Sequence, residues 1–174
     1  MGCTSAGEQL EIYAAGQRDA IGLSGSKNEC WLGKVQIQGS AATVDRKELF
    51  GLLPRLETFG DILLKYLANL TVRIGQRACC AHFHRTHARI SLWLAVAAEI
   101  TGRLELDCTQ QSIADAVGTR RSTVTVTIGE LERQNVLRCQ RGRIDIIDPL
   151  RLQAESCECL AAFRSDGKAT AAAD

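Results

Sequence analysis

Apolar and polar residues alternate in short runs over the first 44 positions, and this spacing predicts β-strands. The expected strands cover Leu10 to Ala15, Ala20 to Leu23 and Gly33 to Gln38. So few strands cannot close a barrel or cover both faces of a sandwich. The apolar face of this sheet must therefore be covered by the helix that follows or by a second chain.

After Asp45 the apolar residues recur three and four positions apart, which predicts helices. Asp45 and Glu48 have the form of a capping box for a short helix that breaks at residues 53–54, and Pro54 suits the first turn of the next helix. This second helix carries a heptad-like seam of Leu56, Phe59, Leu63, Tyr66 and Leu70, flanked by a row of Ile62, Leu67 and Ile74. One row would contact a partner helix and the other its own domain. The alternative is an amphipathic helix that packs only on its own chain.

The next part of the chain has the spacing of a helix-turn-helix. A helix from Arg85 to Thr101 is expected to end before Gly102, and Leu104 to Leu106 reads as a short strand. In the motif itself, Thr109 to Val124, Ala114 is small where two helices would cross and Gly118 lies at the tight turn.

The motif is followed by a hairpin and a last helix. Residues 137–140 and 143–147 flank a bend at Arg141 and Gly142, which predicts two paired strands. Pro149 opens a helix that is expected to run to about Phe163, and residues 165–174 form a polar, alanine-rich tail that is expected to be disordered.

Local propensity and helical spacing disagree over residues 123–128. Six β-branched residues alternate there and by propensity would form a strand. Val124, Ile128 and Leu131 nevertheless continue the helical period, and propensity differences of about 0.5 kcal/mol per residue are easily outweighed by packing. We therefore expect a helix.

Positive charge is concentrated at this motif. The whole chain has a formal net charge of +1, yet residues 120–143 hold six arginines against Glu130 and Glu132. A basic helix-turn-helix points to duplex DNA. The chain has no secretion signal and no apolar run long enough to span a bilayer, so a cytoplasmic protein without membrane contact is expected. Glycine-rich phosphate loops and the GxSxG and HExxH motifs are also missing, so catalysis is not expected.

The eight cysteines favour reduced thiols rather than disulfides, because no secretion signal accompanies them. No CxxC pair occurs, so the cysteine spacing predicts neither a structural zinc site nor another cofactor. One alternative stays open. On a helix, Cys80, His84 and His87 would share a face, where they could bind a metal or haem iron in a metal- or redox-sensing protein.

The run from Glu11 to Cys159 resembles the CRP/FNR family of bacterial transcription regulators. The motifs that carry the resemblance are residues 89–94 (RISLWL), 109–118 (TQQSIADAVG), 120–125 (RRSTVT) and 141–148 (RGRIDIID). The implied fold class is α+β: a partial β-roll of the cyclic-nucleotide-binding type, a long dimerisation helix and a C-terminal winged helix-turn-helix. The corresponding domains are residues 1–48, 49–82 and 83–163, followed by the tail 164–174.

The resemblance also implies functional residues. Residues 121–134 would enter the major groove as a recognition helix, so the residues that read bases would be Arg121, Ser122, Thr125 and Val126. The residues that hold DNA phosphates would be Thr109, Arg120, Thr123, Arg141 and Arg143. The expected partners are double-stranded DNA and a second copy of the chain, with RNA polymerase as a further candidate.

The chain departs from the family pattern in its sensor part. The earlier half of the β-roll, expected before Leu10, is missing, and an acidic residue, Glu29, stands near the expected phosphate position. A carboxylate there would repel a cyclic nucleotide, so a regulator that does not respond to one is expected. The alternative function is a shortened interaction protein that pairs through its long helix with a full-length relative and modulates it.

Overall fold

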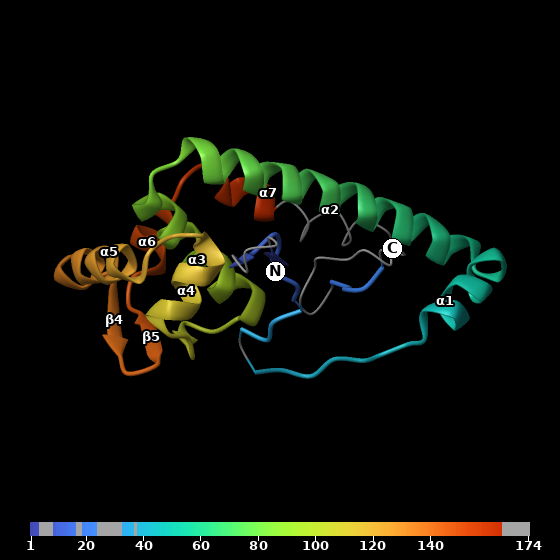
Figure 1. Ribbon diagram of the computed structural model, residues 1–174, viewed down its shortest axis with the longest axis horizontal. Helices are drawn as coiled ribbons and strands as arrows, with labels where there is room; N and C mark the ends of the chain where they lie inside the picture. Colours follow the sequence, from blue (N-terminus) through green and yellow to red (C-terminus); the bar gives the residue numbers. More distant parts are fainter. Residues whose placement is uncertain (4–8, 17–18, 24–32, 37, 165–174) are drawn as a thin grey trace.

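The computed structural model describes residues 1–3, 9–16, 19–23, 33–36 and 38–164, and these form an α+β structure (Figure 1). Two short strands, β1 (Gly2–Cys3) and β2 (Gln9–Leu10), pair antiparallel. They precede helix α1 (Arg46–Leu52), a 3-10 turn (Leu53–Arg55) and the long helix α2 (Glu57–Phe83). The Asp45 carboxylate accepts hydrogen bonds from the backbone N–H groups of Lys47 and Glu48, which is the Asp45 half of the expected capping box.

A helical domain with a small sheet completes the chain. The helices are α3 (Thr86–Thr101), α4 (Gln110–Val117), α5 (Arg121–Arg133), α6 (Pro149–Ala154) and α7 (Leu160–Arg164). Strands β3 (Glu105–Leu106), β5 (Arg143–Ile146) and β4 (Leu137–Gln140) lie side by side in that order, all antiparallel. In Figure 1 these elements gather at one end of α2, with α1 at the other end. None of the described helices is both long and apolar enough to cross a membrane.

Helix α3 is the centre of the core. Its residues 90–96 are all buried, because α4, α5, α6 and α7 pack around it on several sides. Gly102 ends this helix in the left-handed conformation, at a φ of 65°, which a glycine adopts without steric cost. A helix buried on several sides holds the surrounding elements, including the helix-turn-helix, in fixed positions.

Residues 123–128 are helical, which confirms the expectation from spacing over propensity. Val124, Thr127 and Ile128 are buried on the inner face of α5. Burial of each aliphatic side chain stabilises the fold by roughly 1.5–3 kcal/mol, several times the cost of placing a β-branched residue in a helix. The hairpin β4–β5, with Gly142 at its turn at a φ of 76°, is confirmed as well.

The strands expected in the first 44 residues are wrong as placed. Among the described residues, 11–16, 19–23, 33–36 and 38–44 contain no strand, and only Leu10 of the expected segments pairs, in β2. Alternation alone does not make a strand, because each backbone group also needs a partner. Here Glu11 N–H instead donates to Ala116 O at 3.3 Å, which docks the segment on α4.

The prediction of one last helix is also wrong. Residues 155–159 are not helical and separate two short helices, α6 and α7. Asp148 caps α6, with Pro149 in its first turn, as its sequence suggests. At the break, Cys157 and Cys159 both turn inward and are buried. The expected disordered tail from residue 165 and most of the segment around Glu29 lie outside the described residues.

Gly118 gives the first prediction. Its φ is +68°, and an added Cβ would lie 2.8 Å from Leu10 Cδ1. We expect Gly118→Ala to lower the free energy of unfolding by about 1–2 kcal/mol in urea denaturation, since left-handed backbone is costly for alanine. Gly129→Ala is the control. That glycine is helical with nothing within 4 Å of the added Cβ, so alanine there should stabilise by up to about 1 kcal/mol. If both substitutions changed the free energy of unfolding equally, the left-handed backbone of Gly118 would not be what makes alanine costly at this turn.

Candidate functional site

The helix-turn-helix presents the N-terminal end of α5 to solvent. Thr109 caps α4 through a reciprocal capping box with Ser112, and Gly118 ends α4 with its N–H bonded to Ala114 O. Arg120, two residues later, is the N-cap residue of α5, which starts at Arg121. The two helices are therefore fixed relative to each other by backbone geometry and by the buried residues between them.

All four residues predicted to read bases lie on the exposed side of α5. Arg121, Ser122, Thr125 and Val126 are exposed, and 61% of Val126 is accessible despite its apolar side chain. Thr125 Oγ1 lies 2.7 Å from Gln110 Oε1, so its hydroxyl donates to the preceding helix. Among the described residues, the guanidinium of Arg121 has no hydrogen-bond or ion-pair partner. A ligand can therefore approach this group without displacing an internal contact.

The residues predicted to hold phosphates divide into two groups. Thr109, Arg120 and Arg141 are exposed, and Thr123 is half-buried. The Thr109 hydroxyl accepts from Ser112 N–H at 3.0 Å and still has its own hydrogen to donate.

Arg143 differs, because it is already paired within the sheet. Its Nε donates to Asp145 Oδ1 at 2.6 Å, and Nη2 lies 2.5 Å from Glu105 Oε2. The hydrogen bond to Asp145, together with the charges of Asp145 and Glu105, raises the pKa of Arg143. Arg141 is thus the wing arginine better placed to contact a backbone phosphate.

The predicted seam of α2 is partly used within the chain. Leu56 is exposed, whereas Phe59, Leu63, Tyr66 and Leu70 are half-buried. The Tyr66 hydroxyl donates to Ala20 O at 2.9 Å and accepts from Ala20 N–H at 3.1 Å. Tyr66 therefore faces the N-terminal segment and not an open surface.

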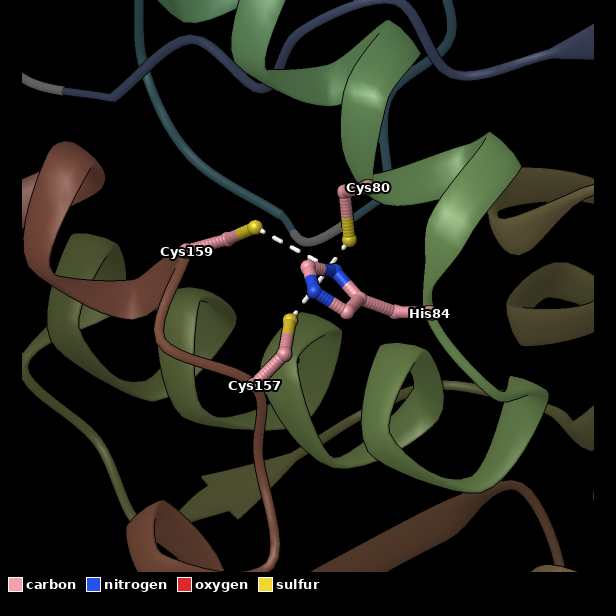
Figure 2. A group of neighbouring side chains, drawn as sticks. All are labelled: Cys80, His84, Cys157 and Cys159. Atoms are coloured by element: carbon pink, nitrogen blue, oxygen red, sulfur yellow. Dashed lines mark hydrogen bonds between the residues drawn. The ribbon is translucent and has the colours of Figure 1, made fainter.

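A cluster of cysteines and a histidine lies where α2 ends. Cys80 and His84 are brought together with Cys157 and Cys159, and one ligand atom from each lies within 4.8 Å of the others (Figure 2). His87 is not part of it, because its ring nitrogens bond Glu130 at 3.2 Å and Glu155 at 3.1 Å. Burial raises the pKa values of Cys80 and Cys157, and the thiols of Cys157 and Cys159 raise that of Cys80 further, so both stay protonated at neutral pH when no cation is bound. The sequence reasoning missed Cys157 and Cys159.

Glu11 is a second position that the sequence reasoning missed. Only 4% of it is exposed, yet it is an acid, and it forms an ion pair with Arg77 of α2. Its other oxygen accepts from Trp93 Nε1 of α3 at 3.0 Å. Desolvation lowers the pKa of Arg77 to about 10. Glu11 thus ties the N-terminal segment, the long helix and the core helix together.

The sequence of this helix-turn-helix is similar to sequences of known proteins. Residues 79–155 match the family model described as the Crp-like helix-turn-helix domain. The transcriptional regulator SdrP of Thermus thermophilus is 42% identical over 53 residues, which are 30% of this chain and 26% of that protein. The chain therefore matches about a quarter of the length of this curated relative.

Solved structures show the same fold. FixK2 from Bradyrhizobium japonicum has a TM-score of 0.59 at 15% identity, covering 66% of this chain and 60% of that one. A CooA mutant from Carboxydothermus hydrogenoformans has a TM-score of 0.54 at 20% identity, covering 65% and 56%. A transcriptional regulator of the crp/fnr family from Eubacterium rectale, described as putative, has a TM-score of 0.52 at 19% identity, covering 63% and 51%. These likenesses confirm the α+β fold with its winged helix-turn-helix.

Proposed function

We propose, on the premise that residues 79–155 are a Crp-like helix-turn-helix domain of the CRP/FNR regulators, that this protein regulates transcription by binding specific sites in double-stranded DNA as a homodimer. The observation that carries the proposal is the exposed start of α5, where Arg121 stands without an internal partner among the described residues. The fold alone would not support this function, because similar folds also serve protein contacts.

Arg121 is the main base-reading residue of the proposed complex. A guanidinium can donate two parallel hydrogen bonds to O6 and N7 of guanine, worth roughly 1–3 kcal/mol of discrimination against other bases. Ser122 and Thr125 add polar contacts to bases, and the exposed Val126 can contact a thymine methyl group. Thr109, Arg120, Thr123, Arg141 and Arg143 would set the position of the protein on the phosphates; Arg143 must first exchange its partners in the sheet.

The long helix α2 supports pairing of two chains. Because Tyr66 turns to the N-terminal segment, the row next to it is the better seam. This row has the three-and-four spacing of a heptad. Leu56, the residue just before α2, starts it, and Gly60, Leu63, Leu67, Leu70 and Ile74 continue it within the helix. Leu56 and Leu67 are 46% and 37% exposed, and Gly60 has no side chain to separate two helices at a crossing. A two-fold axis along this row would place two α5 helices in successive major grooves, about 34 Å apart.

We expect Arg121→Ala to remove a guanine preference from the DNA that this protein selects. The measurement is selection of bound duplexes from a randomised pool at two salt concentrations, with wild-type and variant protein. Wild-type protein should enrich a two-fold-symmetric site, and the variant should lose one guanine in each half. Because two contacts of roughly 1–3 kcal/mol each are lost, it should bind that site at least about 30-fold more weakly.

Arg133→Ala is the matched control for this experiment. It removes the same charge from the same helix, but at the last turn, away from the base edges. It should keep the selected sequence and show only a smaller, salt-dependent loss of affinity. Weak binding without any enriched motif would contradict the proposal and favour the alternative of an interaction protein that modulates a full-length relative.

A further inference from the structure

The geometry points to a closed zinc site made by Cys80, His84, Cys157 and Cys159, which ties the end of the long helix to the C-terminal segment. All four side chains point toward one common centre in Figure 2. Cys80 is the last buried residue of α2 and His84 is its C-cap residue, whereas Cys157 and Cys159 lie in the break between α6 and α7. Three thiolates and one imidazole are a common ligand set for structural Zn²⁺.

Two of the six distances between the ligand atoms match a tetrahedral ion, and all six are at most 4.8 Å. Cys80 Sγ lies 3.6 Å from Cys157 Sγ, and Cys159 Sγ lies 3.4 Å from His84 Nδ1. With Zn–S bonds of about 2.3 Å and Zn–N bonds of about 2.0 Å, the edges of a ZnS₃N tetrahedron measure roughly 3.5–3.8 Å. The four ligand atoms therefore need only small side-chain rotations to surround the ion.

Two neighbours orient the ligands. His84 Nε2 lies 3.0 Å from Glu158 Oε1, so the ring can donate Nε2–H to this carboxylate and turn the lone pair of Nδ1 toward the sulfur atoms. Gln76 Nε2 donates to Cys159 Sγ at 3.0 Å, which fixes the direction of this side chain. A histidine held in this way by a carboxylate is typical of a metal ligand, and buried cysteines that only fill space would not need it.

Binding needs no co-reactant. Three S–H bonds are lost and their protons go to solvent, while three Zn–S bonds and one Zn–N bond form, and no electrons are transferred. Since all four positions are taken by protein atoms, no place is left for water or substrate, and the site is structural. The zinc would hold the α2–α3 junction and α7 together.

The first test is the metal content of the full chain, purified without chelators and without a histidine tag. We expect about one zinc per chain by elemental analysis. After the metal is stripped, added Co²⁺ should give the intense visible bands of tetrahedral thiolate-bound cobalt, and Zn²⁺ should abolish them. The double variant Cys157→Ser/Cys159→Ser should lose both signals. Cys79→Ser is the control, because it changes the exposed neighbour of Cys80 and should keep both.

A second variant keeps the test valid even if loss of two buried cysteines prevents folding. The Glu158 side chain is 81% exposed, so Glu158→Gln should leave the fold intact. Its weaker hydrogen bond to His84 should lower Zn²⁺ affinity about 10- to 100-fold in competition with a chelating dye.

Several outcomes would overturn the zinc site. These are wild-type protein without stoichiometric metal, iron or copper bound in place of zinc, a disulfide between Cys80 and Cys157, or zinc that remains in the double variant. The metal content and cobalt spectrum are measured without DNA, so their result is independent of the proposed DNA binding.

Discussion

Exchanging Leu56 and Leu67 for glutamate is expected to convert the protein to monomers and to lower its affinity for a two-fold-symmetric DNA site by at least about 100-fold. Leu67 lies on the heptad row of α2 and Leu56 immediately precedes the helix at the start of that row; in the single chain they are 37% and 46% exposed. Two glutamates facing their own copies across a two-fold axis would repel each other and remove apolar contact area. Each half-site would then be bound alone, without the gain from linking two binding events.

The control is Leu64→Glu/Val72→Glu. These residues are 67% and 66% exposed and belong to the same helix, but they lie off the heptad row. This variant makes the same change in charge and apolarity and should remain dimeric, with unchanged DNA affinity. Light scattering gives the mass, and fluorescence anisotropy with full and half sites gives the affinities. A Leu56→Glu/Leu67→Glu protein that stays dimeric would rule out this row as the seam.

Most of the helices could be predicted because the spacing of their apolar residues is a local signal, and in α5 this spacing prevails over the propensity of its β-branched residues. In α5 the inward positions Val124, Ile128 and Leu131 keep the helical period, and all three are buried. The sequence alone could not decide which row of α2 is the dimer seam. Phe59 and Tyr66 fit a heptad as well as Leu67 does, and only the contact of Tyr66 with Ala20 separates the two rows.

The Cys and His cluster shows where sequence spacing stops being informative. The helical spacing places Cys80, His84 and His87 on one face and so predicts that the three side chains lie together. His84 is the C-cap residue of α2, however, and the chain turns there, so His87 leads into α3 and meets Glu130 and Glu155. Cys157 and Cys159 are separated from Cys80 by more than 70 positions, and only tertiary packing brings them together.

Alternating apolar residues predict strands in the N-terminal segment. In the part of it that the structure describes, only Gly2–Cys3 and Gln9–Leu10 pair as strands, whereas Glu11, Asp19 and Ala20 bond to residues of the helices. Glu11 was unremarkable in sequence, because an acidic residue is usually exposed. Its role comes from two partners, Arg77 and Trp93, that are distant along the chain.

Glu11→Gln is therefore expected to lower the free energy of unfolding by about 3–5 kcal/mol, the typical cost of removing one partner from a buried ion pair. The amide keeps the volume of the side chain and can still accept from Trp93, but it leaves the charge of Arg77 buried without its counter-ion. Urea denaturation at neutral pH measures the loss. The double variant Glu11→Gln/Arg77→Met should be more stable than Glu11→Gln alone, since it removes the uncompensated charge.

A more exposed ion pair of the N-terminal segment, with α4 and not α2, serves as the control. Lys34 Nζ lies 3.2 Å from Asp115 Oδ2, with 39% and 31% of the two side chains exposed, and it also joins the N-terminal segment to α4. Asp115→Asn should cost no more than about 1 kcal/mol, because water screens and replaces this contact. If Glu11→Gln cost as little as Asp115→Asn, the buried pair could not be what holds the N-terminal segment against α2 and α3. A large difference between them would show that the segment is part of the folded core.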